Sequence, residues 1–130
     1  MREIMLKEPV ELKLPAQQNM MLVLRLTTAG VIARAGLTVD RMDDVKLAVE
    51  EACSCLISAA QAPERLCLRF SEDAQGMKIS VCGDCQCGGA AINEDELAVV
   101  KCILENLVDG VDVCMHGDAI GAIEMRVALN

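Results

Sequence analysis

The sequence contains almost no aromatic side chains. Its 130 residues include one Phe and neither Trp nor Tyr, although 53% of the residues are hydrophobic. The core must therefore be built from aliphatic side chains and from the 8 Met residues, whose flexible chains fill irregular gaps. Because bases stack on aromatic side chains, this composition removes the usual basis for binding single-stranded nucleic acid.

Positive charge is also scarce, with 12 Lys and Arg against 20 Asp and Glu and a formal net charge of -8. A phosphate backbone or an anionic membrane is repelled by such a chain, whereas a basic protein surface is attracted. The sequence has no apolar run near the roughly 18–20 residues of a membrane span. The N-terminal stretch MREIMLKEPVELKL lacks the apolar centre of a signal peptide. We expect a cytoplasmic protein that binds neither nucleic acid nor membrane.

Cysteine is abundant, with 8 residues. In a secreted chain they would indicate a disulfide scaffold, but the missing signal favours reduced thiols that act mainly as small hydrophobic side chains. A chain of this length can bury one core without metal or disulfides. We therefore expect a single domain over residues 1–130.

Hydrophobic periodicity predicts the elements. Period-two alternation predicts strands at 10–14, 65–70, 77–82, 111–115 and 122–129, with turns at 71–76 and 116–121. Spacing of three and four predicts helices at 17–35, 41–60 and 95–108. Gly36 and Gly110 are predicted to end the first and third helices, and Asp40 to cap the second.

The order of these elements indicates an α+β fold. Most strands are joined by hairpins while the helices cluster, which favours a two-layer α/β sandwich. We expect a mixed, mostly antiparallel sheet of about five strands, covered on one face by three helices.

The predicted helix at 41–60 has two distinct faces. One face carries ordinary core residues, namely Val45, Val49, Ala52, Leu56 and Ala59. The other carries Leu47, Glu51 and Cys55, so a carboxylate and a thiol lie one helical turn apart.

The stretch VCGDCQCGG at 81–89 follows a predicted strand and supplies Cys82, Cys85 and Cys87 in a C-x2-C-x-C spacing. Such thiolates bind zinc or an iron–sulfur cluster, could pair by oxidation, or are simply small loop residues. A second paired-ligand motif is missing, because Cys53 and Cys55 point in different directions on a helix.

The helix motif resembles a known family. Asp44, Ala48, Glu51 and Ala52 match in register the pattern D-x-x-x-A-x-x-E-A-x-x-N of the histidine-kinase-like ATPases (GHKL, Bergerat fold), and in particular of the anti-sigma factor serine kinases. The resemblance covers nearly the whole chain. It implies the same fold, binding of ATP with Mg²⁺, phosphorylation of a serine on an antagonist protein, binding of a sigma factor or anti-sigma antagonist, and a homodimer.

The residues that would serve ATP are altered relative to this family. Glu51 occupies the position of the glutamate that orients or deprotonates the attacking group, but Cys55 replaces the asparagine that holds Mg²⁺, a cation that prefers oxygen ligands. In the first glycine box, V-x-D-x-G-x-G, Gly83 stands where the adenine-binding aspartate belongs, and Cys85 and Cys87 replace glycines. Asp84 comes one residue late, which turns its side chain to the other face unless a bulge re-aims it.

The second glycine box is missing as well. It would fall in ELAVVK, where Ala98 and Val100 offer no close backbone approach to a pyrophosphate, and the loop at 88–95 is short for a lid. The candidate nucleotide residues are Glu51, Cys55, Gly83, Asp84, Cys85 and Cys87. Glu51 is either a retained general base or a solvated charge on a helix.

Three hypotheses remain open. We expect first a regulatory protein that binds a sigma factor or an anti-sigma antagonist, with no cofactor and with ATP binding and kinase activity weakened or lost. The second is a metal or redox sensor in which Cys55 joins Cys82, Cys85 and Cys87 across the former nucleotide pocket. The third is an active ATP-dependent serine kinase with a shifted loop in which Asp84 binds adenine.

Overall fold

A computed structural model describes residues 2–59, 62–83, 90–117 and 119–129. The strands are β1 (Val10–Pro15), β2 (Arg65–Glu72), β3 (Gly76–Gly83), β4 (Ala90–Ala91), β5 (Gly110–His116) and β6 (Ala119–Ala128). The helices are the short 3-10 helix η1 (Gln18–Met20), α1 (Met21–Ile32), α2 (Val39–Ile57) and α3 (Glu94–Leu107).

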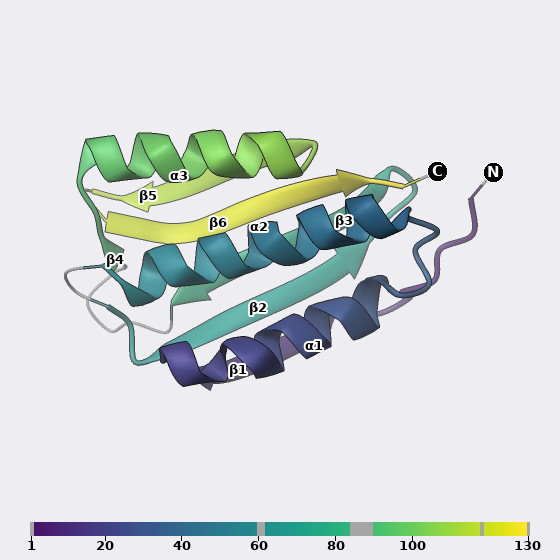
Figure 1. The fold of residues 1–130 in the computed structure, drawn as a ribbon, viewed down its shortest axis with the longest axis horizontal. Coiled ribbons are helices and arrows are strands. Elements are labelled where there is room, and N and C mark those ends of the chain that lie inside the picture. The colour runs from purple at the N-terminus through teal and green to yellow at the C-terminus, as the bar shows by residue number, and fades with distance from the viewer. Residues whose placement is uncertain (1, 60–61, 84–89, 118, 130) are drawn as a thin grey trace.

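The strands form one antiparallel sheet in the order β1-β2-β3-β6, with β5 and the two-residue β4 both paired to β6. The three α-helices lie side by side on one face of this sheet, and the other face is open (Figure 1). The predicted two-layer fold is confirmed. The short strand β4 was not predicted, because two alanines carry no periodic signal.

The core lies between the helices and the sheet and consists of aliphatic, Met and Cys side chains together with Phe70. Alternate residues of the central strands point into it, such as Leu66 and Leu68 on β2 and Ile79 and Val81 on β3. The buried hydroxyl of Thr28 is satisfied within α1, because it donates to the carbonyl oxygen of Leu24 at 2.9 Å. Among the described residues, no helix combines the length and apolarity needed to cross a bilayer.

Two predicted helix ends are wrong. The cap of α2 is Thr38, whose hydroxyl accepts from the backbone N–H of Arg41 at 3.1 Å, while Asp40 lies inside the first turn. Helix α3 ends in an extended residue at Val108, and Gly110 already belongs to β5 without a left-handed conformation. The predicted end of the first helix is also displaced, because α1 ends at Ile32 with Ala33 as its C-cap, and Gly36, although left-handed with φ of +77°, lies beyond the helix.

The predicted turns are longer than the observed ones. Strand β2 continues to Glu72 and β3 begins at Gly76, and the Asp73 carboxylate accepts from the backbone N–H of Gln75 and Gly76 between them. Strand β6 likewise begins at Ala119, inside the predicted turn at 116–121. Hairpin pairing extends the strands into residues whose composition is typical of turns.

Candidate functional site

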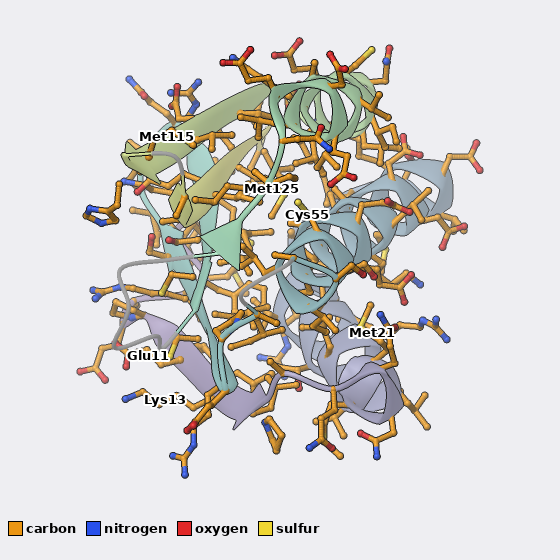
Figure 2. All side chains as sticks on the ribbon, turned by 90° about the vertical axis from the view of Figure 1, so that its left-hand side faces the viewer. Glu11, Lys13, Met21, Cys55, Met115 and Met125 are labelled. Carbon is orange, nitrogen blue, oxygen red and sulfur yellow. The ribbon has the colours of Figure 1, made fainter. Side chains whose placement is uncertain are left out.

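Helix α2 brings Glu51 and Cys55 to the wall of a cavity of about 440 Å³ between α2 and α3. The predicted spacing of one helical turn between the carboxylate and the thiol is realised, and both side chains are partly buried. The cavity is lined by Glu51, Ser54, Cys55, Ser58, Ile92, Asp95, Glu96, Val99 and Val100. Figure 2 shows Cys55 on the helix side of the sheet.

The cavity wall is acidic. In the part of the chain that the structure describes, the lining residues include Glu51, Asp95 and Glu96 but no Lys, Arg or His. Burial, followed by the charges of Glu96 and Glu51, raises the pKa of the Cys55 thiol, so the neutral thiol is favoured at this position. A triphosphate entering here meets like charge rather than a cationic partner.

The second glycine box of the family has no counterpart in the described structure. The segment ELAVVK lies inside α3, where Ala98 is exposed and Val100 lines the cavity. Both positions are helical, so their backbone N–H groups are engaged within the helix and do not form a loop around an anion.

Gly83 ends β3 on the face that the helices cover, since it alternates with the buried Ile79 and Val81. A Cβ atom at this position would lie 2.6 Å from Cβ of the buried Pro63, which is below any normal contact. Pro63 therefore fills the space that an aspartate side chain would need. Sequence patterns gave no signal of this contact, because Pro63 lies outside every predicted element.

Cys82 points to the side of the sheet opposite the helices, whereas Cys55 lies on helix α2. The neighbour of Cys82, Val81, points into the core, so Cys82 points to the open face, where it lines a shallow hollow with Lys13 and Cys67. The structure does not bring Cys55 and Cys82 together as metal ligands. Asp84, Cys85 and Cys87 lie outside the described residues.

The described part of the chain contains no group of three or more His, Cys, Asp and Glu residues that could hold a metal ion. The side chains around Glu51 are also a poor fit for a magnesium-bound triphosphate. Cys55 offers sulfur where the hard cation needs oxygen. The described residues that line the cavity carry no positive charge for phosphates, and Gly83 is closed off by Pro63.

The chain is similar to known proteins over part of its sequence. No family model matches the chain. A serine-protein kinase RsbW of Bacillus mycoides is 42% identical over 53 residues, and that of Bacillus subtilis is 39% identical over 56 residues. These matches cover 41% and 43% of this chain but only 33% and 35% of the relatives, so the similarity spans about a third of their length.

The fold is shared with a solved structure. A crystal structure of the RsbU and RsbW domains of a Mycobacterium tuberculosis protein superposes with a TM-score of 0.73 at 16% identity. It covers 95% of this chain and 33% of the other. The resemblance carried by the helix around Glu51 is thereby confirmed, and this chain is similar in sequence and in fold to the serine-protein kinases of the RsbW type.

Proposed function

We propose that this protein is a regulator of the anti-sigma factor kinase type that acts by binding a protein partner, with nucleotide binding and kinase activity weakened or lost. The resemblance suggests a sigma factor or an anti-sigma antagonist as the partner. The observation that carries partner binding is an exposed apolar surface on α1.

This α1 surface consists of Leu22, Val23, Leu26, Gly30 and Ala33. Leu22, Val23 and Leu26 are 59%, 44% and 63% exposed. Gly30 and Ala33 are exposed beside them at helical spacing. A helix on the surface of a globular protein normally turns charged side chains outward, and a contiguous exposed apolar surface is typical of a protein interface.

Gly30 supports an interface on α1. A Cβ atom at this position would meet nothing within 4 Å, so the fold itself does not require glycine there. Glycine inside a helix costs about 0.5–1 kcal/mol relative to alanine. Because glycine has no side chain, its place in the middle of an apolar surface lets the backbone of a partner approach α1 closely.

The altered nucleotide residues support the second half of the proposal. The acidic cavity and the soft Cys55 disfavour a magnesium-bound triphosphate, and among the candidate nucleotide residues only Glu51 keeps the residue type of the family. A general base without a positioned phosphate and metal contributes little to phosphoryl transfer.

The test is a binding titration of candidate sigma factors and anti-sigma antagonists against the variant Leu22→Asp/Leu26→Asp. Burying one leucine contributes about 1.5–3 kcal/mol, so the variant should lose at least about tenfold in affinity. Val39→Asp is the matched control, because Val39 is 74% exposed at the start of α2 and is not part of the α1 surface.

Equal affinities of the wild type and the double variant for a partner that binds the wild type would contradict the proposal. A loss of binding in Val39→Asp as well would show that added negative charge, not the α1 surface, is responsible. Light scattering on the same samples separates loss of a homodimer from loss of the partner.

A further inference from the structure

A row of side chains crosses three strands on the open face of the sheet. Lys13 of β1 is the register partner of Cys67 of β2, and Cys67 is the register partner of Cys82 of β3. Each alternates with core residues, so all three point away from the helices, as Figure 2 shows for Lys13. Both cysteines are present as thiols.

The two cysteines occupy a hydrogen-bonded position of the hairpin. The backbone N–H of Asp73 donates to the carbonyl oxygen of Gly76 at 2.9 Å, so Asp73 and Gly76 form a hydrogen-bonded pair at the turn end of the β2–β3 hairpin. The register then runs without a shift to Leu66 opposite Gly83. Because hydrogen-bonded pairs recur at every second position, Cys67 and Cys82 form one, with Cα atoms about 5.5 Å apart.

Small molecules can reach both thiols. They line a shallow hollow of about 200 Å³ together with Glu11, Lys13, Arg69 and other residues of β2 and β3. Both are partly exposed, and the Cys82 thiol lies 3.7 Å from the carbonyl oxygen of Cys67. The sulfur of Cys82 therefore already sits beside the backbone of its cross-strand partner.

We propose that Cys67 and Cys82 form a cross-strand dithiol that small-molecule disulfides oxidise to an intramolecular disulfide. One thiol loses its proton to solvent, and the thiolate attacks the small disulfide, forming a mixed disulfide and releasing one small thiol. The second cysteine, also deprotonated, attacks the mixed disulfide at the protein sulfur and releases the second small thiol. The protein loses two electrons and two protons, and the small disulfide is reduced.

The geometry allows this bond and makes it labile. Disulfides span Cα separations of about 4.4–6.8 Å, which includes a hydrogen-bonded pair. The Cβ atoms of a disulfide lie about 3.5–4.5 Å apart. The Cβ atoms of opposite residues in a sheet lie farther apart, at about 4.5–5.5 Å. The strands must move together to close the bond, and strained, exposed disulfides are readily reduced again.

Cys114 provides an internal control on the same open face. Ala122 lies between Cys82 and Cys114 in the register, so two strand spacings of about 4.8 Å separate them. This distance of about 10 Å exceeds what a disulfide can span. The exposed Cys114 should therefore only accept a mixed disulfide.

The experiment exposes the native full chain to oxidised glutathione and maps the products by mass spectrometry. We expect a peptide pair linked through Cys67 and Cys82, and a glutathione adduct on Cys114. In Cys67→Ser the link should vanish and Cys82 should carry a stable glutathione adduct. The variant Cys85→Ser/Cys87→Ser should retain the link in full.

The proposal is overturned if Cys67 and Cys82 each carry glutathione, if neither reacts, or if Cys82 links to Cys85 or Cys87 instead. Circular dichroism of each variant confirms that the sheet is intact before oxidation. The dithiol lies on the face opposite α1 and the cavity between α2 and α3, so its result is independent of partner binding.

Discussion

Glu72 shows how one carboxylate ties the N-terminal segment to the sheet. Its side chain is only 1% exposed and accepts hydrogen bonds from the Arg2 guanidinium and from the backbone N–H groups of Met5 and Leu6, the latter two at 3.0 and 3.2 Å. Burial alone would raise the pKa of this carboxyl, but the hydrogen bonds and the charge of Arg2 outweigh it, and the pKa is lowered.

This lowered pKa predicts a loss of stability in acid. A group with a depressed pKa in the folded state contributes its full stabilisation above the ordinary carboxyl pKa of about 4.3 and loses it as the pH falls toward the folded value. Glu72→Gln should lower the free energy of unfolding by about 1.5–3 kcal/mol at pH 7. Below about pH 5 the stability of the variant should fall less steeply with pH than that of the wild type. Urea denaturation of both proteins across this range tests it, and identical pH slopes would contradict it.

The contact between Gly83 and Pro63 predicts a steric coupling. Gly83→Ala should destabilise the fold by about 1–3 kcal/mol, because the added Cβ falls 2.6 Å from Cβ of Pro63. In the background of Pro63→Gly, which removes that Cβ atom, the same change should cost much less. A double-mutant cycle in urea measures this coupling, and additive effects would rule out the contact.

The relative positions of side chains within one helix or strand were predictable from the sequence, and contacts between elements were not. The spacing of Glu51 and Cys55 follows from helix geometry alone, and α2 confirms it. The closure of Gly83 by Pro63 and the separation of Cys82 from Cys55 by the sheet depend on tertiary packing. No sequence period encodes either one.

At the scale of the element, the start of α2 rests on Thr38. Its hydroxyl accepts from the backbone N–H of Arg41, so Thr38→Ala should destabilise the protein by about 0.5–2 kcal/mol. Asp40→Ala removes a first-turn charge but no cap, and should cost less. Thermal or urea unfolding ranks the two variants, and a larger loss for Asp40→Ala would refute the assignment of the cap.

Helix α1 allows stability and partner binding to be separated. Gly30→Ala should raise the free energy of unfolding by about 0.5–1 kcal/mol, because the methyl group meets no neighbour and glycine disfavours the helix. If a partner packs closely on the α1 surface, the same variant should bind it more weakly. Chemical denaturation and a binding titration on the same preparation measure both, and a stabilised variant with unchanged affinity would place the contact elsewhere.

The sequence predicted most elements but not which side of α1 is buried. Strands and helices with alternating polar residues, such as β2 and α2, were placed within a few positions. Helix α1 is apolar nearly all round, so its pattern does not select a face. Val23 and Ile32 are both apolar residues of α1, yet Val23 is 44% exposed and Ile32 is buried.

At the scale of the whole molecule, the sheet separates one surface from two others. The acidic cavity lies between α2 and α3, the apolar surface lies on α1, and an open face with cross-strand ion pairs lies behind both. On this open face Arg69 pairs with Glu11 at 3.6 Å and Arg126 with Asp112 at 3.1 Å. A partner on α1 and an oxidant on the open face would therefore act independently.

The central claim is that a kinase-type fold persists here without an effective nucleotide site. Isothermal titration of the full chain with ATP and Mg²⁺ tests this most directly, with Asp84→Ala as the companion variant. We predict no saturable binding up to millimolar nucleotide, equivalent to an affinity weaker than about -4 kcal/mol. Micromolar binding that disappears in Asp84→Ala would contradict the claim and indicate an active kinase with a shifted nucleotide loop.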